Sequence, residues 1–70
     1  MYNRTAFSQA FALCRTARGL SLKEYSKLLN IDERTLQEYE NGSKLPTLFR
    51  FQRICKKLNV TPNDLLGYSG

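Results

Sequence analysis

Apolar residues recur along this 70-residue chain at intervals of three and four, the spacing that places side chains on one face of an α-helix. The first such segment extends from about Thr5 to Arg18 and ends at Gly19. The apolar positions that form its predicted buried stripe are Phe7, Ala10, Phe11, Cys14 and Ala17. No segment alternates between apolar and polar residues as a half-buried strand would, so the pattern predicts an all-α chain.

A second helix is predicted to begin at Ser21, whose hydroxyl can accept a hydrogen bond from a free backbone amide. Glu24 follows three residues later and can bond back to the Ser21 backbone, which completes a capping box. The side chains expected on the buried face of this helix are Leu22, Tyr25, Ser26 and Leu29. Lys23 and Lys27 then point to solvent.

A third helix is predicted after a turn at Asn30–Ile31, with Asp32 as its N-cap. It should extend to about Glu40, because Asn41–Gly42 favours a helix end. The side chains expected to face inward are Thr35, Leu36 and Tyr39. The opposite, polar face carries Glu33, Arg34, Gln37, Glu38 and Asn41. Two short helices joined by so few residues have the layout of a helix-turn-helix, a unit whose second helix lies against DNA.

A fourth helix is introduced by Pro46–Thr47 and is predicted from about Leu48 to Leu58. Its expected core positions are Leu48, Phe51, Ile54, Cys55 and Leu58. A basic stripe that lies away from the core comprises Arg50, Arg53 and Lys57. Helical spacing also turns Phe49 away from the core, as it does Leu28 on the second helix, and both are expected to be exposed.

A short last helix is predicted from Thr61 as N-cap and Pro62 at the first position, where the missing amide has no bond to lose. The residues expected to close the core before Gly67 are Val60, Leu65 and Leu66. The predicted fold is therefore a compact bundle of five helices, in a single domain that covers residues 1–70. Each helix is too short to be stable alone, so packing must drive folding.

Composition is ordinary for a soluble globular domain, with 41% hydrophobic and 24% charged residues, but the formal net charge of +5 favours a negatively charged partner. No apolar run approaches the roughly 20 residues that span a bilayer, so no contact with a membrane is expected. The N-terminal segment lacks the apolar centre of a signal peptide. A cytoplasmic location is expected.

The residue types that most enzymes and metal sites need are scarce in this sequence. Cys14 and Cys55 lie far apart on predicted core stripes, so we expect buried free thiols, with a disulfide or a reactive thiol as the alternative. With no histidine, the chain cannot complete a zinc site and lacks the usual general base near neutral pH. We therefore expect no enzyme activity, no metal and no cofactor.

A set of characteristic positions runs through most of the chain: Arg15, Gly19–Ser21, Leu29, Ile31, Thr35–Leu36, Glu40–Gly42, Pro46, Leu48, Ile54, Leu58, Val60 and Leu65–Leu66. In their joint spacing, residues from about Phe11 to Gly67 resemble the phage-repressor type of helix-turn-helix, the Cro and repressor or xenobiotic-response-element class. The resemblance implies the fold of the lambda-repressor-like DNA-binding domains. It also implies an ion pair between Arg15 and Glu40.

For function, the resemblance implies that the third helix lies in the major groove of double-stranded DNA. The residues that could then meet base edges are Glu33, Arg34, Gln37 and Glu38. Arg34 suits guanine, Gln37 suits adenine, and a glutamate can accept from the cytosine amine. The residues that occupy the family's phosphate-contacting positions are Asn41, Ser43, Lys44 and Thr47. The expected activity is transcriptional regulation, with repression favoured.

Two departures from the family pattern concern this surface. The family usually has a glutamine at the start of the second helix, where this chain has Leu22, which cannot contact phosphate. The segment from Asp32 to Glu40 carries four carboxylates against one guanidinium, a net charge of −3. Glu33 and Glu38 therefore each need a base amine or a neighbouring cation such as Arg34. A competing hypothesis keeps the fold but makes it a protein-interaction module, an antirepressor or adaptor whose acidic third helix meets a basic surface.

Family members commonly bind palindromic sites as homodimers, with half-sites about 34 Å apart. The residues that we expect at such an interface are Phe49, Leu65 and Tyr68.

Overall fold

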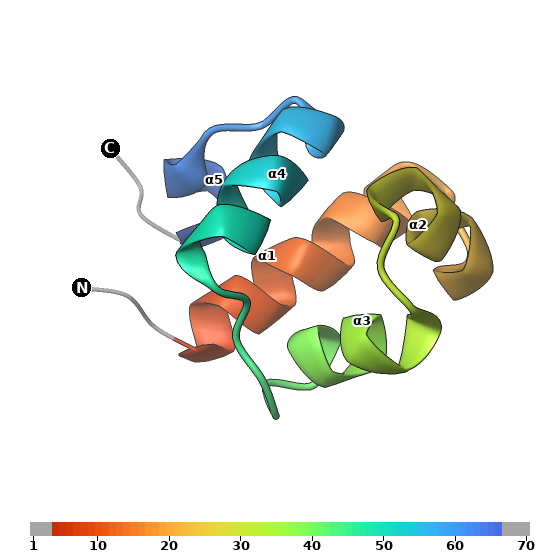
Figure 1. Ribbon diagram of the computed structural model, residues 1–70, viewed down its shortest axis with the longest axis horizontal. Coiled ribbons are helices and arrows are strands. Elements are labelled where there is room, and N and C mark those ends of the chain that lie inside the picture. Colours follow the sequence, from red (N-terminus) through yellow and green to blue (C-terminus); the bar gives the residue numbers. More distant parts are fainter. Residues whose placement is uncertain (1–3, 67–70) are drawn as a thin grey trace.

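The computed structural model describes residues 4–66, and this part of the chain contains five helices and no strand (Figure 1). Their bounds are α1 Arg4–Ala17, α2 Leu22–Leu29, α3 Glu33–Glu40, α4 Leu48–Leu58 and α5 Pro62–Leu66. The predicted all-α class is confirmed, and so is each predicted helix. Within residues 4–66, no helix has both the length and the apolar character needed to cross a membrane.

Helix α1 runs through the middle of the molecule, with α3 on one side of it and α4 and α5 on the other (Figure 1). It contacts both α3 and α5. Helix α2 packs against α3 and α4, and α4 contacts α5. The helix-turn-helix pair α2–α3 is thus attached to the rest of the fold through α1 and α4.

An aromatic cluster forms the centre of the core. Phe7 and Phe11 stack with ring centroids 5.4 Å apart, and Tyr25 lies 4.9 Å from Phe11. The Tyr39 ring meets both phenylalanines edge-on. The buried hydroxyl of Tyr25 donates a hydrogen bond to the Phe11 carbonyl oxygen at 2.9 Å, so this polar group has a partner inside the core. Helices α1, α2 and α3 therefore each contribute an aromatic ring to the shared core, beside buried aliphatic side chains such as Leu29 and Leu36.

Capping residues fix where α2 and α3 begin. Ser21 and Glu24 form the predicted capping box. The Ser21 hydroxyl oxygen accepts from the Glu24 amide at 3.1 Å, and the Glu24 carboxylate accepts from the Ser21 amide at 2.8 Å. Asp32 accepts from both the amide and the hydroxyl of Thr35 at the start of α3. The hydrogen bond from the Thr35 hydroxyl, together with the one from the Thr35 amide, lowers the pKa of the Asp32 carboxyl below its ordinary value. Between the two helices, Asn30 takes a left-handed conformation with φ 57°.

Two predicted core positions are wrong. Leu48 is 69% exposed, because it is the first residue of α4 and its side chain leans back toward the helix N-terminus, beyond the core. Ala17 is also exposed, since at 100° per residue it lies about 80° around α1 from Phe7. Leu65 is fully buried as expected, whereas the side chain of Leu66, and Gly67 and Tyr68, lie outside the described residues.

Candidate nucleic-acid interface

Helix α3 separates its side chains into a buried and an exposed face. Leu36 and Tyr39 are buried in the core, as the spacing predicts. Glu33, Arg34 and Gln37 are exposed on the other side. They belong to one short, capped helix, and Figure 1 shows this helix at an edge of the molecule. The helix thus presents a polar surface whose backbone is held by the core behind it.

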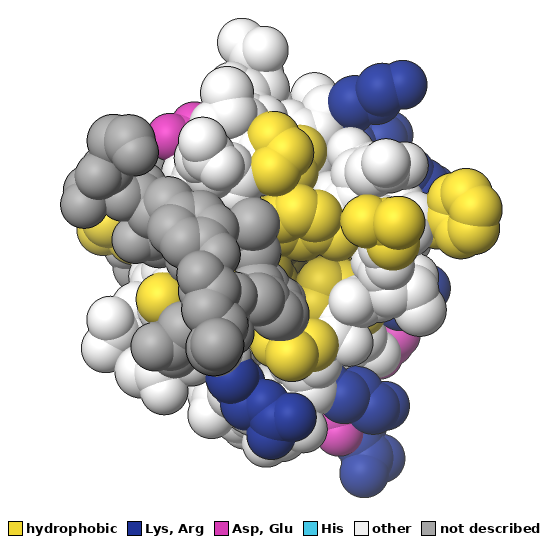
Figure 2. All heavy atoms as spheres, turned by 90° about the vertical axis from the view of Figure 1, so that its left-hand side faces the viewer, with side chains coloured by type: hydrophobic (Ala, Val, Ile, Leu, Met, Phe, Trp, Pro, Cys, Tyr) yellow, Lys and Arg dark blue, Asp and Glu magenta, His cyan; other side chains and the backbone are white. Residues whose placement is uncertain are grey.

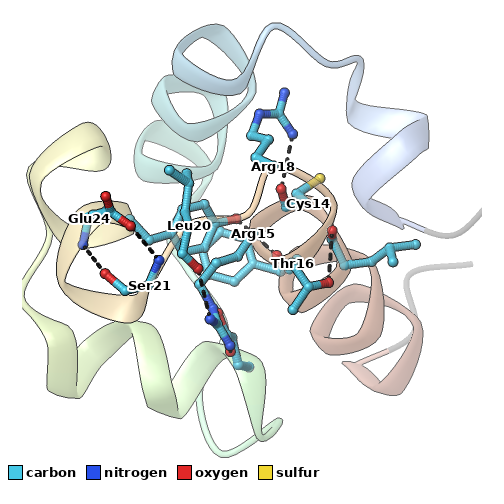
Figure 3. Close-up of polar contacts among 11 residues, drawn as sticks. Cys14, Arg15, Thr16, Arg18, Leu20, Ser21 and Glu24 are labelled. Atoms are coloured by element: carbon cyan, nitrogen blue, oxygen red, sulfur yellow. Dashed lines mark hydrogen bonds and ion pairs between the residues drawn. The ribbon is translucent and has the colours of Figure 1, made fainter.

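The far end of α3 is tied to α1 by Arg15 and Glu40. Arg15 Nε donates to Glu40 Oε2 at 2.8 Å and Arg15 Nη2 donates to Oε1 at 3.1 Å, so the ion pair expected from the family resemblance is present and bidentate. Arg15 Nη1 also donates to the Leu20 carbonyl oxygen at 3.1 Å (Figure 3). The hydrogen bonds to Glu40 raise the pKa of Arg15 above its ordinary value. One guanidinium therefore joins α1, the α1–α2 loop and α3.

Glu38, the second carboxylate on the last turn of α3, has its own cation. Lys44 Nζ lies 3.4 Å from Glu38 Oε1, and the Lys44 backbone amide donates to the Glu38 carbonyl oxygen at 3.2 Å. The sequence analysis suggested Arg34 as the compensating cation, but Lys44 fills that place. With Glu40 paired to Arg15, two of the acidic groups in this segment are matched by basic groups from elsewhere in the chain.

The turn after α3 is held by hydrogen bonds between its own residues. Asn41 Oδ1 accepts from the Ser43 amide at 2.8 Å and also from the Ser43 hydroxyl. Between them, Gly42 has φ 82°, a backbone conformation that other residues rarely adopt. Asn41 and Ser43, both expected to contact phosphate, are thus bonded to each other and fix the direction of the loop that carries Lys44.

The first turn of α4 faces the same end of the molecule as this loop (Figure 1). Thr47 is the N-cap, and its hydroxyl accepts from the Arg50 amide at 3.2 Å. Arg50 Nη1 donates to the Tyr39 hydroxyl at 3.2 Å and so links α4 to α3. Arg50 was expected in a basic stripe away from the core, and its bond to the Tyr39 hydroxyl was not predicted. Its spacing on α4 carries no signal for a partner eleven residues earlier on another helix.

Arg18 also makes a contact between helices that its position in the sequence does not predict. Its guanidinium donates to the Cys14 carbonyl oxygen at 3.2 Å (Figure 3). It also donates to the Leu58 carbonyl oxygen at the end of α4. A cation at a helix C-terminus complements the partial negative charge of the last carbonyls. Arg18 therefore connects the end of α1 to the end of α4.

Both cysteines are free within the fold. Cys14 is half-buried and Cys55 is buried. Burial raises the pKa of each thiol above its ordinary value, which favours the protonated, unreactive form. Both side chains therefore pack as small apolar groups.

An apolar surface lies on the side of the molecule formed by α4 and α5. Phe49 is 80% exposed, in agreement with its predicted orientation. It borders an open groove whose lining includes Gln52, Arg53, Lys56, Val60 and Pro62. Figure 2 shows hydrophobic side chains gathered on this face with basic side chains around them. Leu65 does not belong to this surface, because its side chain is fully buried, so its predicted place at an interface is wrong.

Comparisons with known proteins agree with this architecture. The sequence profile of the helix-turn-helix family matches residues 12–65. The chain is also similar to the crystal structure of the restriction-modification controller protein C.AhdI from Aeromonas hydrophila, with 26% sequence identity and a TM-score of 0.79. That similarity covers 89% of this chain and 94% of the controller protein. Among curated protein sequences, none matches this chain.

Proposed function

This chain belongs to the helix-turn-helix family of the phage-repressor type, and from that membership we propose that it is a transcription regulator which reads double-stranded DNA with α3. The observation that carries the proposal is the exposed face of α3, because Arg34 and Gln37 project from a helix that is anchored at both ends. An α-helix fits the major groove, where Arg can bond guanine and Gln can bond adenine. Glu33 belongs to the same proposed reading face.

Phosphate contacts are proposed for the loop that follows α3 and for the start of α4. Lys44 would supply charge, and the hydrogen-bonded turn of Asn41 and Ser43 would hold the loop against the DNA backbone. The free amides in the first turn of α4, after Thr47, suit a phosphate oxygen. The ion pair of Glu40 with Arg15 reduces the repulsion that this acidic segment would otherwise exert on DNA.

We further propose that two copies bind one palindromic site and that binding represses transcription. The similar structure is that of a restriction-modification controller protein, and control of a gene by a small DNA-binding protein is the role that this likeness supports. Two copies related by a twofold axis would place their α3 helices about 34 Å apart, one turn of the duplex. The exposed Phe49 is the residue proposed at the contact between copies.

Titration of a random-sequence duplex pool, and of duplexes selected from it, tests the proposal. We expect the logarithm of affinity to fall linearly with the logarithm of salt concentration, and the selected duplexes to bind more tightly than the pool. Absence of binding at about 50 mM salt would contradict the proposal and favour the alternative of a protein partner for α3.

Two substitutions locate the reading face. Arg34→Ala should weaken binding to the selected duplex by about 1 to 3 kcal/mol and relax the preference at one base pair. Lys44→Ala should weaken binding to all duplexes alike. The control is Lys57→Ala, which removes the same charge from an exposed position in the last turn of α4, away from the proposed phosphate contacts at its start. If Arg34→Ala and Lys44→Ala both bind like the parent protein, α3 is not the reading helix.

A further inference from the structure

Glu38 and Lys44 are joined in two different ways. The Lys44 amide donates to the Glu38 carbonyl oxygen at 3.2 Å, which fixes where the Lys44 backbone lies. The second contact is the ion pair at 3.4 Å between side chains that are 61% exposed for Lys44 and 29% exposed for Glu38. The backbone contact therefore holds the residue in place, while the exposed ammonium can change its partner by rotation about its own side-chain bonds.

We propose that Glu38 competes with the DNA backbone for the Lys44 ammonium, so that binding of DNA transfers this group from the carboxylate to a phosphate. The inference rests on the proposed function. It makes Glu38 a positioning residue that acts through Lys44, instead of a residue that reads a base. Glu38 would hold the ammonium at the end of α3 in the free protein and weaken binding to every duplex by the same factor.

The exposure of the pair makes the exchange feasible. An ion pair between flexible, solvated side chains favours the paired state by at most about fivefold, because water screens the charges and pairing restricts both side chains. The line of phosphates along a duplex attracts an ammonium more strongly and releases bound counterions when it is neutralised. Approach of the duplex should therefore break the pair.

The other carboxylates of α3 differ from Glu38 in this respect. Glu40 is 14% exposed and is held bidentately by Arg15, which also bonds the Leu20 carbonyl, so this pair cannot open without loosening α1 from α3. Glu33 is exposed at the first residue of α3, and no basic side chain among residues 4–66 lies within ion-pair distance of it. Glu33 thus offers a matched control with the same charge on the same helix.

The test uses the full chain and three substitutions that remove a charge but leave a polar side chain: Glu38→Gln, Glu33→Gln and Lys44→Gln. Five variants are made, namely each substitution alone and Lys44→Gln combined with each of the other two. Affinity is measured for a selected duplex and for an unrelated duplex at several salt concentrations, and far-ultraviolet circular dichroism verifies that each variant is folded.

Glu38→Gln is expected to tighten binding to both duplexes by the same factor, up to about fivefold, and most of that gain should be lost when Lys44→Gln is also present. The salt slope of Glu38→Gln should equal that of the parent, while Lys44→Gln should be shallower by about 0.9. The effect of Glu33→Gln should be the same with and without Lys44→Gln.

Three results would overturn the proposal. If Glu38→Gln alters binding to the selected duplex only, Glu38 reads a base. If the slope of Glu38→Gln exceeds that of the parent by about 0.9 and Lys44→Gln leaves it unchanged, the pair stays closed on DNA. If the parent binds neither duplex, the proposed function fails as well. In the first two cases the salt dependence of the parent still supports DNA binding.

Discussion

At the scale of single residues, burial decides what an ion pair does in this protein. Arg15 and Glu40 are 24% and 14% exposed and share two hydrogen bonds, so each is largely shielded from water and would be left without a partner if the other were removed. Lys44 and Glu38 have the same charges, but Lys44 remains 61% exposed and keeps its water. The first pair is therefore expected to support the fold, and the second to respond to a ligand.

Substitution of Arg15 tests the structural pair. Arg15→Ala should lower the free energy of unfolding by about 2 to 3 kcal/mol, because it leaves the Glu40 carboxylate largely buried without a partner and removes the bond to Leu20. Urea denaturation measures the change. Lys44→Ala is the matched control for an exposed pair and should change stability by less than about 0.5 kcal/mol. Equal effects of the two substitutions would contradict the distinction.

Tyr25 should make the stability of the protein depend on alkaline pH. Burial raises the pKa of its hydroxyl, which donates to the Phe11 carbonyl oxygen, so the folded protein keeps a proton that the unfolded chain loses above about pH 10. The folded-state pKa is the higher one. The contribution of Tyr25 is therefore fully present below about pH 10, and above it the free energy of unfolding falls by about 1.4 kcal/mol per pH unit.

The variant Tyr25→Phe isolates this effect. It should be less stable than the parent by about 1 kcal/mol at pH 7, because the bond to Phe11 is lost, and it should lack the steep fall above about pH 10. Urea denaturation across this range, with Tyr39→Phe as a control that leaves Tyr25 in place, provides the measurement. A parallel loss of stability in the parent and in Tyr25→Phe would show that Tyr25 is not the group responsible.

At the scale of elements, the short connection between α2 and α3 sets the shape of the reading unit. Asn30 ends α2 in the left-handed conformation, with φ 57° and ψ 44°, and its amide donates to the Ser26 carbonyl oxygen. The Ser26 hydroxyl in turn donates to the Ile31 carbonyl oxygen. The direction in which the chain enters α3 therefore depends on one residue in a conformation that most side chains disfavour.

Replacement of Asn30 tests this dependence. Asn30→Ala should destabilise the protein by about 1 kcal/mol, because a Cβ in the left-handed region meets the following carbonyl oxygen and alanine has no polar side chain to compensate. Asn30→Gly removes that clash and should stay within about 0.5 kcal/mol of the parent. Thermal unfolding followed by circular dichroism distinguishes the two. If both variants lose the same stability, strain is not the cause.

The helices and their caps follow from local sequence, and this is why they could be predicted. The Ser21–Glu24 capping box depends on residues three apart, and the buried faces of α2 and α3 follow from the helical period. The bonds of Arg18 to Leu58 and of Arg50 to Tyr39 could not be predicted, because they depend on how separate helices meet. The predicted burial of Leu48 is wrong because helical spacing does not show where a helix extends past the helices that it packs against.

The candidate site likewise has features that local sequence predicts and features that depend on how distant segments meet. The exposed positions of Arg34 and Gln37 follow from the period of one helix. The pairing of Glu38 with Lys44 depends on the loop turning back along α3, which the Asn41–Ser43 hydrogen bonds and Gly42 bring about. The Arg15–Glu40 pair was expected only because the chain resembles a family, since residues 25 positions apart carry no local signal of contact.

At the scale of the whole molecule, the two surfaces proposed to meet different partners are separate. The exposed side of α3 and the loop after it form the proposed DNA surface, while Phe49 belongs to α4 and borders the groove lined by residues of α4 and the start of α5. Phe49 is 80% exposed, and contact of its apolar ring with water is unfavourable. Contact with a second copy of the chain would bury the ring. Assembly and DNA binding would then use separate residues of one small domain.

A substitution at Phe49 tests the proposed pairing of two copies. Phe49→Ser should shift the protein toward monomer in analytical ultracentrifugation and weaken binding to a palindromic duplex by about tenfold or more. Binding to a single half-site should not change, and neither should the unfolding temperature, because Phe49 contributes little to the core. Leu28→Ser, on the exposed side of α2, is the control for loss of a surface hydrophobe. Retained self-association of Phe49→Ser would place the dimer contact elsewhere.

Helix α1 contacts both α3 and α5, and its two phenylalanines fill the centre of the core. The helix proposed to read DNA therefore depends on the rest of the fold: a peptide containing only α2 and α3 would lack the α1 side chains that cover Leu36 and Tyr39. Unfolding of the C-terminal half should therefore also abolish the proposed binding of DNA by α3. The fraction of DNA bound and the fraction of protein folded should fall together as temperature rises.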